Sequence, residues 1–478
     1  MIRVRAVLAA ACLALAAACT SPDERIAGFA DQWDRGEFAG AEASIDQLIA
    51  SESGTDLAVV TSSHGLDESI DANEGDTFLF LLEKAMTRLA AGDLDSAIDL
   101  LRRSRDALAK RWDDTDVKGF LSAGLGDDTF RDYTGADYEH VVVPALLAVV
   151  DLLNGGQDAF AYALQVGEVQ ERILGSTFGE NLDEEGHGYN PRKEYQRLAI
   201  GAYVEGLLRE REGFGSEANK AYERARAWGG DTNPVIAEAV QRTGGGAFAA
   251  PHHGVVHVFR FAGRGPRLVQ GSSPITDQAL LLANVGSILI GESIGVIGQT
   301  MIPVPVVANP DSVIAPLEVR VDGQVAGSTA TVLDVGAVAG QQLNANMPWI
   351  LARAAIRRGV KAVAAKAAQD ASSDDWGFLA GLATNLVLTA GENADTRNWT
   401  SLPSQLQVAR FELPEGESTL DLGLGLLVPV RVAAGKDTYV LVIQPDLAHG
   451  GRAIVDVYSR VAAPAVPSPA PEATAPVP

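Results

Sequence analysis

The stretch LAAGDLDSAIDLLRRS, residues 89–104, decides how the first half of the chain folds. Gly92 ends one helix and supplies the positive φ that a tight turn between two helices requires. Leu94, Ala97 and Leu101 follow at spacings of three and four residues, which place them on one face of the next helix. The small side chain of Ala97 lets a neighbouring helix approach closely. The stretch therefore predicts a helical hairpin that packs against other helices.

Three further stretches repeat this order of glycine, apolar residue and small residue. They are WDRGEFAGAEASI at residues 33–45, LLNGGQDAFAYALQV at 152–166 and EGFGSEANKAYERA at 212–225. The pattern resembles tetratricopeptide hairpins, although its glycines recur at roughly 55–65 residues rather than the ~34 of a regular array. Either the hairpins carry long insertions or the repeat is looser; chance periodicity in four ordinary helices is the alternative. We predict a helical-repeat domain over residues 19–246, a type that binds proteins more often than it catalyses reactions.

Length and charge limit the classes of function. The chain has 478 residues, enough for more than one domain, and 47% of them are hydrophobic, as is ordinary for a globular protein. Its formal net charge is −24. A surface this acidic repels phosphate backbones, so we expect no nucleic-acid partner.

The first residues have the composition of a signal peptide. Arg3 and Arg5 precede an apolar run that is too short to span a membrane as a helix, so residues 1–18 are assigned as a leader. The two cysteines of the chain are Cys12 and Cys19. The chain after Cys19 therefore has no disulfide framework and no cysteine-based metal site.

The end of the leader, LAAAC at residues 15–19, resembles the lipobox of bacterial lipoproteins. The resemblance implies that Cys19 is lipidated and anchors the mature protein without spanning the bilayer. Ala16 stands where a leucine is usual, which leaves ordinary cleavage after Ala18 as the alternative. Thr20 follows the cysteine in place of aspartate, and by resemblance this implies the outer membrane, with the protein facing the periplasm.

The second half of the chain has a different character. Beyond Gly246 the residues Pro, Gly, Val and Ile become common and clean helical periodicity is lost, so residues 247–461 are predicted to form an α+β domain with an antiparallel sheet. Helices are expected over residues 343–369 and 376–388. Strands are expected at residues 255–261, 407–413, 424–432, 437–445 and 453–461. The Pro/Ala-rich residues 462–478 are expected to be a disordered tail.

A long apolar stretch lies at residues 280–307. It contains Glu292 and four glycines. A carboxylate near the middle of a membrane span is costly, so we predict buried strand or helix packing, with membrane contact as the alternative.

The sharpest enzymatic pattern is GESIG at residues 291–295, which matches the G-x-S-x-G nucleophile elbow with Ser293 as nucleophile. Residues 287–290 could form the strand that must precede an elbow, and His449 follows in the required order. An α/β-hydrolase, however, needs several βα units before the serine, and the chain after Gly246 offers too few residues for them. The hydrolase is therefore an alternative and not the main hypothesis.

Two groups of residues could hold a metal. Asp137, Glu139 and His140 begin an apolar helix, where acidic residues usually cap the N-terminus, and we favour capping with a solvated face. His253 and His257 share one side of a predicted strand without a further ligand at convincing spacing, and we favour surface histidines. We expect no metal site and no cofactor.

Two sets of residues are candidates for binding. Asp395 and Arg397 can pair, and Trp399 could stack on them or on a ligand; a buried ion pair at the junction of helix and sheet is favoured over a binding edge. A second set could line the concave face of the repeats, although core packing is the favoured role for each. Its members are Tyr138, Tyr203 and Tyr222.

Three segments carry a resemblance to a family of uncharacterised bacterial envelope lipoproteins with tetratricopeptide-like repeats. They are Asp137-Tyr138-Glu139, Asn344-Ala345-Asn346-Met347-Pro348 with the arginine-rich helix after it, and ADTRNWTSLP at residues 394–403. The resemblance implies an envelope location and a two-part architecture, and it supplies no catalytic residues.

These observations favour a non-enzymatic, lipid-anchored scaffold or assembly factor whose partner is an envelope protein or peptide. Two alternatives stay open. One is a serine hydrolase that uses Ser293 and His449. The other is a carrier of lipid or another hydrophobic ligand that uses residues 280–307.

Overall fold

The computed structural model describes residues 22–62, 70–113, 120–121, 133–229, 232–245, 249–292, 301–309, 311, 313–370, 393–423, 425–448 and 450–461, with the side chains of residues 364–370 left out. Helices dominate the first half and strands the second, so the α+β class predicted from the sequence is confirmed.

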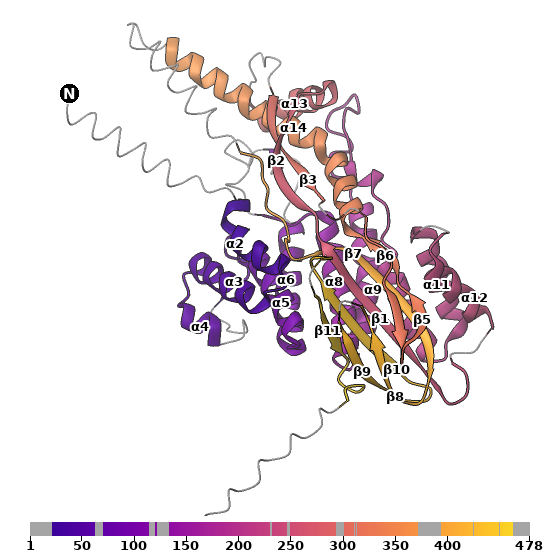
Figure 1. The fold of residues 1–478 in the computed structure, drawn as a ribbon. Helices are drawn as coiled ribbons and strands as arrows, with labels where there is room; N and C mark the ends of the chain where they lie inside the picture. Colours follow the sequence, from indigo (N-terminus) through magenta and orange to yellow (C-terminus); the bar gives the residue numbers. More distant parts are fainter. Residues whose placement is uncertain are drawn as a thin grey trace, which may run out of the picture.

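The helices of the first half pair into hairpins (Figure 1). Their bounds are α2 Pro22–Asp34, α3 Phe38–Ser53, α4 Leu57–Ser62, α5 Thr77–Ala91, α6 Leu94–Asp113, α8 Asp137–Leu153, α9 Ala159–Leu174, α10 Ile200–Arg211, α11 Gly215–Gly229 and α12 Pro234–Gly245, with the short 3₁₀ helix η2 at Pro191–Glu194. The pairs α2–α3, α5–α6, α8–α9 and α10–α11 pack together.

Each predicted hairpin glycine lies at the turn between the two helices of its pair. Gly36, Gly92, Gly156 and Gly213 have φ values of 72°, 81°, 68° and 83°, a region that a side chain would penalise. The small residue that follows the turn is buried, as at Ala97, whose exposure is 0%. The helical hairpin predicted from residues 89–104 is therefore confirmed.

The strands form three sheets. Their bounds are β1 His253–Arg264, β2 Arg267–Pro274, β3 Met301–Ala308, β4 Glu318–Val321, β5 Gln324–Ser328, β6 Ala330–Asp334, β7 Pro403–Pro414, β8 Gly416–Asp421, β9 Leu427–Val432, β10 Asp437–Gln444 and β11 Arg452–Val455. The main sheet has the order β11-β10-β1-β7-β6, the second β5-β4-β8-β9, and the third pairs β2 with β3. The pairing is antiparallel except between β1 and β10.

The main sheet is buried on both faces. Along β1, Val256 and Val258 belong to the core shared with the second sheet, whereas Phe259 and Phe261 belong to the core shared with the helices. Because successive side chains alternate across a strand, β1 supplies both cores at once. The molecule is therefore layered as helices, main sheet and second sheet, and one continuous core crosses from the helices to the sheet.

The change from helix to strand lies between Gly245, the end of α12, and His253, the start of β1. Two more helices, α13 Asp277–Ile290 and α14 Val335–Asp370, pack together beside β3 and extend away from the main sheet (Figure 1). The predicted stretch 280–307 thus contains most of α13 and most of β3. Within the described residues, no helix is long and apolar enough to cross a membrane.

The long helix α14 begins eight residues before the predicted start at 343. The Asp334 carboxylate accepts a hydrogen bond from the backbone N–H of Ala337 at 2.8 Å, as expected of an N-terminal cap. The second helix predicted at residues 376–388 lies outside the described residues.

Candidate functional site: a cavity between the helical hairpins, helix α14 and a strap

Residues 394–402, here called the strap, precede β7 and are bound by buried glutamates of the helices. Glu83, in the middle of α5, accepts the backbone N–H of Thr400 at 2.6 Å and that of Ser401 at 2.9 Å. Burial raises the pKa of Glu83 to about 7, although these hydrogen bonds oppose the shift. One carboxylate thus satisfies two adjacent backbone donors that would otherwise be buried without partners.

Glu139, in the first turn of α8, binds the next strap amide. It accepts the backbone N–H of Trp399 at 2.9 Å, the hydroxyl of Tyr133 at 2.7 Å and the backbone N–H of Ala136 at 3.0 Å. Burial raises its pKa above the usual value. The predicted capping role is present in the bond to Ala136, but the predicted solvated face is wrong because Glu139 is 0% exposed.

The predicted pair of Asp395 and Arg397 is present. The Arg397 Nη2 lies 2.8 Å from the Asp395 carboxylate, and its Nη1 lies 2.9 Å from Asp76, just before α5. Trp399 is 0% exposed and packs in the core. Arg397 and Trp399 therefore fix the strap to the helices, as the favoured interpretation expected.

The face of the repeats that we expected to be concave and open is covered. Helices α5 and α8 are buried along nearly their whole length, and α14 and β10 pack on α8. Tyr203 and Tyr222 are 2% and 1% exposed, and their rings lie tilted against each other with 5.7 Å between the centroids. Both tyrosines are therefore core residues, which is the role that the sequence favoured, and they do not line an open binding face.

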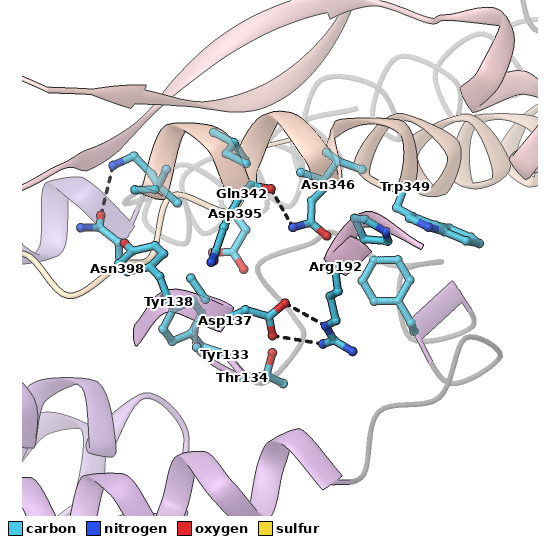
Figure 2. A pocket seen from close by; sticks show the side chains of 18 of the residues that line it. Tyr133, Thr134, Asp137, Tyr138, Arg192, Gln342, Asn346, Trp349, Asp395 and Asn398 are labelled. Carbon is cyan, nitrogen blue, oxygen red and sulfur yellow. Dashed lines mark hydrogen bonds and ion pairs between the residues drawn. The ribbon is translucent and has the colours of Figure 1, made fainter. Parts of the chain in front are cut away.

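A cavity of about 250 Å³ remains between α8, η2, α14 and the strap. In Figure 2, Gln342 and Asn346 descend from α14 toward the wall that holds Asp137 and Tyr138, and Trp349 lies farther along α14, beyond Arg192. Of the predicted binding candidates, Tyr138 and Asp395 line this cavity. It therefore brings together residues from the first half, the middle and the end of the chain.

The two acidic groups of the cavity, Asp137 and Asp395, are each paired with an arginine. Asp137 forms a bidentate pair with Arg192, with Oδ–N distances of 2.9 and 3.1 Å (Figure 2). Burial alone would raise the pKa of Asp137, but Arg192 outweighs it and the pKa is lowered. Asp395 is held by Arg397, and the guanidinium of Arg353 stacks 4.5 Å from the ring centroid of Phe120. Asp137 is thus part of an ion pair, not the solvated cap expected from the sequence.

Two neutral polar groups of the cavity are not engaged. Among the described residues, the Oε1 of Gln342 is buried without a hydrogen-bond partner, and no hydrogen bond joins the hydroxyl of Tyr138 to another described residue. Gln342 is 7% exposed, and burial raises the pKa of Tyr138 well above 10, so its hydroxyl keeps its proton. Buried polar groups usually find partners, and those that lack them mark a place where another molecule can bind.

Aromatic side chains form the apolar wall. Three rings of this wall meet edge to face. Their centroids lie 5.5 Å apart for Phe120 and Phe178, 5.6 Å apart for Phe178 and Trp349, and 6.3 Å apart for Phe120 and Trp349. Trp349 is held by a hydrogen bond from its Nε1 to the carbonyl of Tyr189 at 2.8 Å. A rigid aromatic wall with a few convergent polar groups is the usual composition of a site for a small organic ligand.

The structure before Ser293 does not have the form that a nucleophile elbow requires. Residues 287–290 are the last turn of α13, and Gly291 is its C-terminal cap with φ 76°, so the strand required before an elbow is absent there. Ser293 and His449 themselves lie outside the described residues, as does Cys19.

The histidine prediction on β1 is half correct. His253 is partly exposed, but His257 is 3% exposed, and its Nε2 lies 3.1 Å from Asp437. It is therefore a core residue and not a surface histidine. Among the described residues, no group of three or more potential ligands is placed to hold a metal ion.

The cavity residues of α14 were missed in the sequence. Gln342 lies just before the predicted helix start, and Trp349 lies inside the predicted helix after Pro348, so neither was marked as a site residue. The fold and site together define an α+β protein with helical hairpins on a two-sheet sandwich and a partly open cavity lined by aromatic side chains. Comparison of the chain with protein families, with characterised proteins and with solved structures finds no match.

Proposed function

We propose that this protein is a lipid-anchored component of the bacterial cell envelope that binds a ligand in the aromatic cavity and performs no chemistry of its own. The observation that carries the proposal is the cavity itself, which Tyr138 and Gln342 line and in which the Oε1 of Gln342 is buried without a hydrogen-bond partner among the described residues. The repeats would then serve as a frame for the site, since their inner face is covered.

The position of the cavity supports this function. The three segments on which the family resemblance rests supply Tyr138, Asn346 and Asp395 to its lining. They are separated by up to ~250 residues in sequence, yet they meet at one place. A scaffold or assembly role is compatible with this site if binding of the ligand accompanies binding of an envelope partner.

Binding can be tested by photo-crosslinking in the native host. A diazirine amino acid at Leu343, which lines the cavity, should trap the ligand and add a discrete mass to the protein after irradiation. The control places the same amino acid at Phe214, a 50% exposed residue of the α10–α11 turn. If position 343 gains no mass, or both positions gain the same mass, the cavity is not a ligand site.

The anchor is tested separately by intact mass and membrane fractionation, with Cys19→Ala as the comparison. The anchored protein should carry the mass of a diacyl- or triacyl-glyceryl group and need detergent for extraction, and the variant should show neither property. An unmodified, soluble wild-type protein that begins at Cys19 would contradict the envelope anchor and leave the cavity proposal unaffected.

A further inference from the structure

We infer that one arm of the molecule lies against the lipid surface of the membrane to which the chain is anchored. The arm consists of residues 267–290, 301–308 and 353–369, which include β2, α13, β3 and the second half of α14, and it extends away from the main sheet (Figure 1). The inference rests on the lipid anchor of the proposed function and adds a second contact with the membrane.

The helix α13 is apolar on two faces. Its inner face, with Leu282 and Ala283, packs on α14 and is buried. Leu281, Val285 and Ile288 follow one another at spacings of four and three residues, so they form a stripe along the outer face. Ile288 is 79% exposed. A helix at the surface of a globular protein usually has polar residues on its outer face, so this apolar stripe points to a partner.

Exposed apolar side chains gather in the arm. Of the fifteen large hydrophobic side chains that are exposed among the described residues, seven belong to it, although the arm is a small part of the chain. Gathering of this kind marks a surface of interaction, whereas single exposed apolar residues do not. The seven are Val269, Leu281, Ile288, Leu289, Met301, Val306 and Val363.

The anchor lies near the base of the arm. The described chain begins at Pro22, which lines a hollow together with Val269 of β2. Arg267 of β2 pairs with Asp34 of α2 at 2.6 Å and fixes the two elements to each other. Cys19 is three residues before Pro22, a span of at most ~11 Å. An acyl group on Cys19 therefore brings the base of the arm to the membrane surface.

Charge also distinguishes the arm from the rest of the chain. The whole chain has a net charge of −24, yet residues 353–369 contain five basic residues and no acidic one. Asp277 is the one acidic residue of α13, and β2 and β3 have none. Basic and apolar segments are attracted to a surface of anionic phospholipid, which repels acidic ones. The anchor and the charge together favour lipid over protein as the partner of the arm.

The test is photo-crosslinking of the full chain in its native host, with a diazirine amino acid at Ile288. Irradiation should join this position to membrane lipid and add the mass of a phospholipid. The control position is Phe214, which is exposed but lies outside the arm, and its yield of this adduct should be at least ten-fold lower. Equal yields at both positions, a protein adduct at position 288, or no adduct there would each overturn the inference.

A charge on the same face tests the apolar contact. With the diazirine amino acid at Leu281, Ile288→Asp should lower the yield of the phospholipid adduct roughly five-fold, because a carboxylate is costly in the apolar part of a membrane. Val325→Asp, at an exposed position outside the arm, is the matched control and should leave the yield unchanged. Both variants should unfold thermally as the unsubstituted chain does, since both positions are exposed. An unchanged yield in the folded Ile288→Asp variant would contradict the lipid contact.

The intact mass of the same samples separates this inference from the anchor on which it rests. An acylated protein without a phospholipid adduct at position 288 would reject the arm and keep the anchor. A phospholipid adduct on a protein with unmodified Cys19 would reject the anchor and support the contact of the arm with lipid. Ligand binding in the cavity is measured independently at position 343.

Discussion

Neighbouring residues of the short segment Tyr133–Glu139 differ in how their polar groups are used. On the strap side, Glu139 accepts three hydrogen bonds and the Tyr133 hydroxyl donates one of them. On the cavity side, the Tyr138 hydroxyl has no partner among the described residues. Side chains a few residues apart therefore serve different ends: one group holds the two halves of the chain together, and the other is available to a ligand.

The largest change in the free energy of unfolding is expected for a substitution in the strap. Arg397→Met leaves Asp76 and Asp395 without their shared cation in a buried place, and we expect the free energy of unfolding to fall by about 3–5 kcal/mol. The control is Arg431→Met, which breaks an ion pair of the same 2.8 Å length to Glu417, but with both side chains more than half exposed. It should cost less than about 1 kcal/mol. Denaturant unfolding of both variants measures the contrast, and equal losses would show that the strap is not a structural anchor.

The pH dependence of stability tests the glutamate that binds the strap. The pKa of Glu83 rises from 4.5 to about 7 on folding, so between these values the native state keeps a proton that the unfolded state releases. The stability that this proton provides is complete below pH 4.5 and is lost as the pH rises to 7, by about 3 kcal/mol at most.

Glu83→Gln removes this titration. Unfolding curves at several pH values should therefore show a flatter profile for Glu83→Gln than for wild type between pH 5 and 7. Glu168→Gln, at an exposed position of α9, should run parallel to wild type. Parallel profiles for wild type and Glu83→Gln would mean that the carboxylate is ionised in the native state throughout this range.

The smallest changes in stability are expected for substitutions of Tyr133 and Tyr138, and they test the comparison between these two residues. Tyr133→Phe removes a hydrogen bond to the buried Glu139 and should cost about 1–2 kcal/mol. Tyr138→Phe removes a hydroxyl without a partner among the described residues and should change stability by less than about 0.5 kcal/mol. Each variant is the control for the other in thermal unfolding. A larger loss at Tyr138 would mean that its hydroxyl has a structural role.

Local patterns were sufficient to predict the hairpins. A glycine and a small residue a few positions later report only the turn and the packed face, and both are decided by nearby residues, as at Gly92 and Ala97. The strands at the end of the chain were likewise predicted from alternation. The parallel pairing of β1 with β10 was missed because the two strands are far apart in sequence and alternation does not specify a partner.

The site could be predicted only in part. Asp395 and Arg397 are two residues apart, so their pairing could be expected from the sequence alone. The contact of Arg397 with Asp76, and the hydrogen bonds that the backbone N–H groups of Thr400 and Ser401 donate to Glu83, join positions more than three hundred residues apart. Acidic residues before an apolar helix looked solvated, because no local feature shows that a distant segment covers them.

The strap also has a consequence for the order of events during synthesis. The carboxylates of Glu83 and Glu139 leave the ribosome long before their partners, which follow 317 and 260 residues later. Until then the carboxylates of Glu83 and Glu139 lack the backbone N–H donors that residues 399–401 supply. Contacts so distant slow folding, and chains of this size populate aggregation-prone intermediates. A chain truncated before residue 399 should therefore fail to give a stable helical half, and a chaperone would have to protect the nascent hairpins until translation is nearly complete.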